Sequence, residues 1–67
     1  MAVARVTELV ASSDKSFEDA IRAAIERAAK TLRGITGVEV TRQTVKVEKN
    51  KPKEWRVHLN VTFVLEG

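Results

Sequence analysis

The fold of this chain is decided by its last long apolar stretch, residues 55–65, which reads WRVHLNVTFVL. Its large apolar residues occupy every odd position and alternate with a second set, which is mostly polar. Because successive side chains of a β-strand point to opposite faces, this period predicts a strand with one apolar and one mostly polar face. At about 3.3 Å per residue the strand would run about 35 Å, so it needs neighbouring strands beside it and an apolar partner beneath it.

That partner is expected to be a helix over residues 17–33. Apolar residues recur there at spacings of three and four, which places them on one stripe of a helix. The stripe consists of Phe17, Ala20, Ile21, Ala24, Ala28 and Leu32, widened by Ile25. Ser16 is the expected N-cap, because Asp19 lies three residues further on, and Ser13 is the alternative. Gly34 stands where a left-handed residue commonly ends a helix.

Two further strands are expected to complete the sheet, over residues 3–11 and 38–48. Alternation in the first of them is imperfect. The segment 49–53, which reads KNKPK, is expected to form a polar turn, because Pro52 cannot donate to a central ladder. Two long strands around so short a turn indicate an antiparallel hairpin.

The second of these strands changes parity along its length. Val38 and Val40 occupy even positions, whereas Val45 and Val47 occupy odd ones. A strand with a strict period of two cannot place both pairs on one face, so a bulge near residues 42–44 is expected. The alternative is that the two ends of the strand bury opposite faces.

The resulting order of strand, helix, strand, strand predicts an α+β fold with three antiparallel strands around one helix. The 67 residues form one domain, residues 1–67, and a chain this short buries only about 60% of its extended surface. With no Cys and a single His, neither a disulfide framework nor a histidine metal site is expected. One face of the sheet stays open and the hairpin should overhang the helix, so assembly with other copies is expected.

Composition points to an ordinary soluble globular domain, with 43% hydrophobic and 31% charged residues and a net charge of +3. No apolar run is long enough to span a membrane, and the N-terminus does not resemble a secretory signal, so a cytoplasmic protein is expected. A basic stretch runs along and after the strand expected over residues 38–48, but Glu48 and Glu54 interrupt it. No aromatic residues interleave with its charges, so nucleic-acid binding is not expected.

At this point the sequence resembles the dodecin family, nearly end to end. The residues that carry the likeness are VASS at 10–13, SFEDAI at 16–21, AIERA at 24–28, VEV at 38–40 and WRVHLNVTFVLE at 55–66. The resemblance implies a β-α-β-β subunit whose antiparallel sheet wraps partly around one helix. It further implies a hollow homododecamer of cubic symmetry that binds a flavin (riboflavin, lumichrome or FMN) at two-fold sites between subunits, for storage or sequestration rather than catalysis.

The ligand site implied by the resemblance involves Gly37, Val38, Thr44 and Arg56. Flavin-binding members carry, at the position of Gly37 and just before the segment that starts at Val38, a Trp whose ring sandwiches the isoalloxazine. At the position of Arg56 they usually carry a Gln that hydrogen-bonds the pyrimidine edge of the flavin. Some members have arginines for phosphate-bearing ligands at the positions of Thr44 and Val64. Aromatic stacking is worth about 0.5–1.5 kcal/mol beyond area burial, so these departures should lower the affinity for flavin.

The remaining candidates suit packing better than chemistry. Trp55 shares the parity of the apolar face, so it is expected to extend that face rather than to replace the missing stacking Trp. His58 is expected to be a solvated or interface residue, since no nucleophile–base pair or paired carboxylates accompany it, and no catalysis is expected. Arg56 is open to two interpretations: a surface or interface ion pair with Glu39, or a ligand contact through its guanidinium.

A cation site built on oxygen ligands is a further hypothesis. Glu8, Asp14 and Glu39 carry the carboxylates that hard cations prefer. No loop motif spaces them as ligands, so no metal site is assigned. The alternative function is therefore a dodecin-like shell without flavin, with a structural or ion-binding role.

Overall fold

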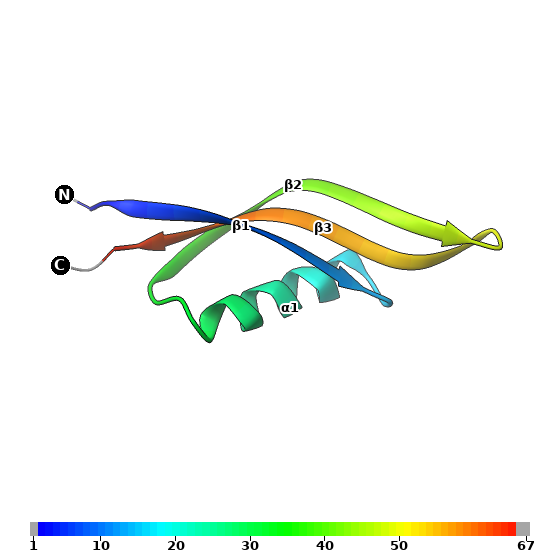
Figure 1. Cartoon of the computed structure of the whole chain (residues 1–67), viewed down its shortest axis with the longest axis horizontal. Coiled ribbons are helices and arrows are strands. Elements are labelled where there is room, and N and C mark those ends of the chain that lie inside the picture. The colour runs from blue at the N-terminus through cyan, green and yellow to red at the C-terminus, as the bar shows by residue number, and fades with distance from the viewer. Residues whose placement is uncertain (1, 66–67) are drawn as a thin grey trace.

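The computed structural model of the chain describes residues 2–65. Its elements are β1 (Ala4–Ser13), α1 (Phe17–Ala29), β2 (Ile35–Glu48) and β3 (Lys51–Val64). The strands form one antiparallel sheet in the order β1-β3-β2, and α1 lies against one side of it (Figure 1). The predicted α+β fold is confirmed, with the stretch that decides it as the central strand.

The core lies between β3 and α1, as the alternation predicts. Val57, Leu59 and Val61 are fully buried on β3. They face a stripe of small residues on the helix, in which Ala20, Ala24 and Ala28 are buried. Alanines allow the helix to approach the sheet closely, so the large side chains of the core come from the strand. The outer parts of the helical stripe pack against this core: Phe17, Ile21 and Leu32.

Two residues of the predicted apolar patterns, Ile25 and Leu65, lie outside the core. Ile25 is 37% exposed, so it does not widen the buried stripe. Leu65 is also exposed, because it lies beyond the end of β3. On β1, Leu9 and Ala11 pack against the core, whereas Val6 and Val10 face away from the helix and are exposed.

The helix begins where the sequence indicates. The Ser16 hydroxyl accepts a hydrogen bond from the backbone N–H of Asp19 at 3.0 Å, which confirms Ser16 as the N-cap. Ser13, the alternative cap, instead uses its hydroxyl to donate to the Asp19 carboxylate at 2.7 Å. Together these bonds close the corner between β1 and α1.

The end of the helix differs from the expectation. The helix stops at Ala29 instead of residue 33, although the N–H of Leu32 still donates to the carbonyl of Ala28 at 2.8 Å. Gly34 has a φ of +73°, and its carbonyl accepts from the N–H of Val64 at 2.9 Å. The chain must leave the helix early to reach β3, and the left-handed Gly34 makes that turn.

The expected bulge exists in β2. Its pairing with β3 shifts between Val40 and Arg42, so the extra residue is Thr41, one position before the predicted range. After the shift Val45 lies opposite Trp55, on the same side of the sheet as the valines that precede the bulge. The valines on both sides of the bulge therefore share one face of β2, which only Gln43, opposite Val57, interrupts, so the bulge and not a change of buried face explains the change of parity.

The hairpin turn is shorter than predicted. Lys49 and Asn50 both have positive φ, 53° and 62°, as a two-residue type I′ turn requires. Pro52 is already part of β3. Because β1 ends at Ser13, opposite Trp55, β3 has a free edge at Pro52, and a free edge tolerates the missing N–H.

The hairpin overhangs the helix, as expected. The molecule measures 52 × 20 × 13 Å, and a helix of 13 residues spans only about 20 Å (Figure 1). Beyond the helix, Val45 and Val47 are 40% and 60% exposed. Within residues 2–65, no helix is both long enough and apolar enough to cross a membrane.

The close contact between helix and sheet predicts that Ala20 tolerates no larger side chain. Ala20→Leu should lower the free energy of unfolding by about 1–3 kcal/mol, because Ala20 is fully buried against β3. The matched control is Ala29→Leu, which places the same side chain at an exposed position of the same helix. Denaturant unfolding curves measure both variants, and equal midpoints would contradict this packing.

Candidate functional site

The face of the sheet that points away from α1, called here the outer face, carries the polar residues of β3. Residues paired across the strands share a face, so the register defines its members. From β1 they are Ala4, Val6, Glu8, Val10 and Ser12; from β3 Glu54, Arg56, His58, Asn60, Thr62 and Val64; and from β2 Gly37, Glu39, Arg42, Thr44, Lys46 and Glu48. The prediction that the even positions of β3 face away from the helix is confirmed.

The structure places three of the four predicted ligand residues on this face. Thr44 pairs directly with Arg56, and Gly37 pairs with Thr62. Val38 pairs with Val61 and packs against the core, so its side chain points to the other side of the sheet. Val64, the second position that matches a phosphate-binding arginine, shares the outer face at the end of β3.

Within one chain these residues lie too far apart to contact the same ligand. Thr62, opposite Gly37, lies six residues from Arg56 along β3, which corresponds to about 20 Å. The structure therefore brings Thr44 and Arg56 together but leaves Gly37 far from both. A ligand in contact with both ends would need groups from more than one copy of the chain.

The backbone conformation at residue 37 does not require a glycine. Gly34 is the glycine with positive φ among the described residues, and a Cβ built on Gly37 meets no atom within 4 Å. A side chain at this position would project into open space on the outer face. The position could therefore carry a large aromatic ring without a clash inside the subunit.

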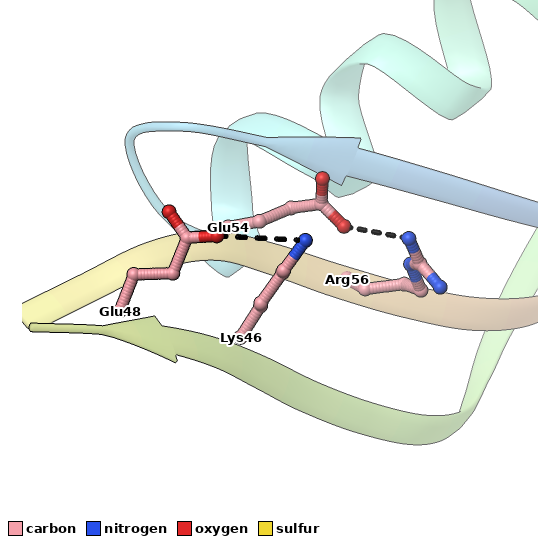
Figure 2. A network of polar contacts seen from close by, with 4 residues as sticks. All are labelled: Lys46, Glu48, Glu54 and Arg56. Atoms are coloured by element: carbon pink, nitrogen blue, oxygen red, sulfur yellow. Dashed lines mark hydrogen bonds and ion pairs between the residues drawn. The ribbon is translucent and has the colours of Figure 1, made fainter.

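Arg56 forms an ion pair, but not with the expected partner. Its Nη2 lies 2.7 Å from Oε1 of Glu54, and the two side chains are 50% and 31% exposed (Figure 2). Glu39 lies opposite Asn60, four residues further along β3, so the expected pair with Glu39 does not form within the subunit. Exposed pairs of this kind contribute about 0–1 kcal/mol to stability, so Glu54 mainly positions the guanidinium.

The pair lies at the edge of an open hollow of about 200 Å³ near the hairpin. Its lining residues are Thr44, Val45, Lys46, Glu54 and Arg56. Lys46 lies 3.7 Å from Glu48, so the four charged groups form two pairs of opposite sign (Figure 2). The lining thus offers hydrogen-bond donors and acceptors, and each of its two cations is paired with a carboxylate.

Among residues 2–65, the His58 side chain takes part in no hydrogen bond or ion pair. His58 is half-buried on the outer face between Val10 and Arg42, and its carbonyl accepts from the Thr41 hydroxyl at 3.1 Å. Trp55 is half-buried between Ser13 and Val45 on the helix side of the sheet, as its parity predicts. It does not take the place of an aromatic ring at Gly37.

The structure separates the proposed cation ligands. Glu8 and Glu39 lie on either side of Asn60, whereas Asp14 lies beyond the end of β1. From residue 2 to residue 65, no three His, Cys, Asp or Glu side chains come together as a metal site would require.

Sequence reasoning did not single out Glu54 as a functional residue. The available signal is its spacing: residues two apart on a strand share a face, so an acidic residue at 54 lies beside Arg56. Lys46 is its partner across the hairpin. That pairing depends on the bulge and on the short turn, so the sequence alone does not reveal it.

Comparisons with known proteins match this architecture along the whole chain. The Dodecin family model matches residues 3–66. A curated protein named dodecin, from Thermus thermophilus, is 41% identical over 64 residues, which cover 96% of this chain and 93% of that protein.

Solved structures agree. A crystal structure of a Thermus thermophilus dodecin point mutant matches with a TM-score of 0.94 and 39% identity over 100% of both chains. Streptomyces coelicolor dodecin matches with a TM-score of 0.92 and 36% identity, covering 98% of this chain and 94% of that one. A Mycobacterium tuberculosis protein, described as a calcium-chelating calcium dodecin with a novel calcium-binding site, matches at 0.82 and 26%, covering 96% and 91%.

Gly37, within β2, and Gly34, just before it, should respond oppositely to replacement by alanine. Gly37→Ala should leave the free energy of unfolding unchanged or raise it by up to about 1 kcal/mol, because the added Cβ meets nothing and the unfolded chain loses freedom. Gly34→Ala should lower it by about 1 kcal/mol or more, because its φ is +73° and a Cβ would lie 3.0 Å from the Val64 carbonyl. Denaturant midpoints that fall equally in both variants would contradict this placement.

Proposed function

The chain belongs to the dodecin family, and we propose that it is a non-catalytic cytoplasmic protein that binds a small aromatic ligand, a flavin, for storage or sequestration. The ligand lies at two-fold sites between subunits of a hollow homododecamer. The observation that carries this proposal is the position of Gly37, Thr44 and Arg56 on one open face of the sheet, too far apart to enclose a ligand within one chain.

Assembly is supported by the apolar surface that one subunit leaves uncovered. Val45 and Val47 extend past the helix, and Val6 and Val10 are both 57% exposed on the outer face. A domain of this size buries little core of its own, and further copies of the chain would cover these side chains.

A binding role is supported by what the outer face offers. It carries hydrogen-bonding side chains and an open hollow, whereas the His58 side chain forms no hydrogen bond or ion pair with any residue that the structure describes. Recognition of a planar ligand needs donors and acceptors, which this face has, and a flat stacking surface, which Gly37 does not supply.

The affinity for flavin should be lower than in family members that carry the stacking Trp. Gly37 supplies no ring, and Arg56 replaces an amide that both donates and accepts by a group that only donates. With no arginine at Thr44 or Val64, a phosphate on the ligand gains no dedicated contact. Riboflavin, lumichrome and FMN should therefore bind with similar, modest affinity.

Restoring the aromatic ring tests the flavin site. Gly37→Trp should raise the affinity for riboflavin about thirtyfold, because a stacked ring contributes about 1 kcal/mol on each side of the ligand. Quenching of riboflavin fluorescence measures the binding, and Gly37→Ala, which should bind like the unaltered chain, is the control. Absence of quenching by the unaltered chain and by Gly37→Trp alike would rule out the flavin.

A second candidate is a shell of the same family that binds a cation instead of a flavin. It is favoured by the similarity to the calcium dodecin and by the two departures at Gly37 and Arg56. Glu8 and Glu39, with Asn60 between them, supply oxygen ligands on the outer face, and a neighbouring subunit would supply the rest.

Calcium titration separates the two candidates. If the shell serves a cation, calorimetry should detect binding of Ca²⁺ that Glu39→Gln weakens, while Glu48→Gln leaves it unchanged. No heat of binding at millimolar Ca²⁺ would exclude this candidate.

A further inference from the structure

The ion pair between Glu54 and Arg56 has hydrogen-bonding capacity that the subunit does not use. The guanidinium Nη2 carries two hydrogens, and its bond to Oε1 of Glu54 uses one of them. The carboxylate oxygen can likewise accept a second hydrogen bond. Throughout residues 2–65 neither side chain makes another hydrogen bond.

The unused donor and acceptor lie next to each other. Nη2 and Oε1 are 2.7 Å apart, and the two side chains point toward one another over the outer face (Figure 2). In an amide or imide group, bond lengths of about 1.33 Å for C–N and 1.23 Å for C=O place the nitrogen about 2.3 Å from the oxygen. A ligand edge with N–H beside C=O therefore matches the pair in spacing and in polarity.

We infer that Glu54 and Arg56 together read the imide edge of the ligand, with Glu54 as a specificity-determining residue. This inference rests on the proposed binding function. Arg56 donates to a carbonyl oxygen of the ligand, and Glu54 accepts from the neighbouring N–H. The pair thus supplies both halves of the contact that one Gln amide makes in other members, whereas Arg56 alone supplies only the donor.

The charges around the pair favour an uncharged edge. Both cations that line the hollow, Lys46 and Arg56, already have a carboxylate partner, so a phosphate approaching the hollow would meet little uncompensated positive charge. The side chains of Glu54 and Arg56 are partly exposed in the single subunit. Covering them with a ligand removes water, which makes both hydrogen bonds stronger and an unpaired Glu54 more costly.

Methylation of the ligand nitrogen tests the inference. Riboflavin and 3-methylriboflavin differ only in the N–H that Glu54 is inferred to accept. The unaltered chain should bind riboflavin about tenfold more tightly, as expected for a hydrogen bond to a charged group. Glu54→Ala should weaken the binding of riboflavin and bring the two affinities within about twofold of each other.

Two further variants separate the loss of the hydrogen-bond acceptor from the loss of a side chain as such. Glu48→Ala removes a carboxylate of the same face that does not line the hollow, and it should leave the ratio of affinities unchanged. Glu54→Gln retains an acceptor oxygen and should keep part of the discrimination. If 3-methylriboflavin is rejected as strongly by Glu54→Ala as by the unaltered chain, the methyl group clashes elsewhere and the inference is overturned.

The same titrations in a Gly37→Trp background distinguish failure of the inferred role of Glu54 from failure of the proposed function. Tight binding of riboflavin in that background with a ratio that Glu54→Ala does not change overturns the role of Glu54 and leaves the proposed function standing. Absence of riboflavin binding with and without Gly37→Trp removes the proposed function, and the imide contact with it. Light scattering should give every variant the same assembled mass as the unaltered chain, which shows that assembly is intact.

Discussion

The strict alternation of β3 is the constraint on which the rest of the structure depends. Burying Val57, Leu59 and Val61 on one face fixes the register with both neighbouring strands, because a slip by one residue would turn these side chains to water. The helix can approach this face only through small residues, which accounts for Ala20, Ala24 and Ala28. The polar residues of the same strand are thereby committed to the outer face.

That commitment makes the outer face the candidate site. The helix protects one side of the sheet, so the other side is left with polar groups, a hollow near the hairpin and uncovered valines. Gly37 and Arg56 share this side but lie far apart along β3. The proposed function follows from this geometry: only a second copy of the chain can place an additional group over the same ligand.

The sequence predicts the features that depend on neighbouring residues in the chain. The N-cap at Ser16 and the apolar face of β3 follow from spacing alone, and the bulge was expected within one position of Thr41. The early end of α1 and the position of Pro52 depend instead on where distant segments meet, because Gly34 must reach Val64 and β1 must stop at Trp55. Glu54 was missed as the partner of Arg56, although residues two apart on a strand share a face, whereas the position of Glu39 opposite Asn60 depends on the register.

The central claim is that the outer faces of separate copies complete one flavin site. Its most direct test is the assembled mass in solution, with an absorption spectrum recorded on the same peak after incubation with riboflavin. The account predicts a particle of about twelve chains that carries flavin absorption. Riboflavin bound to a single free chain, or a particle that stays colourless even when Gly37→Trp restores the ring, would contradict it.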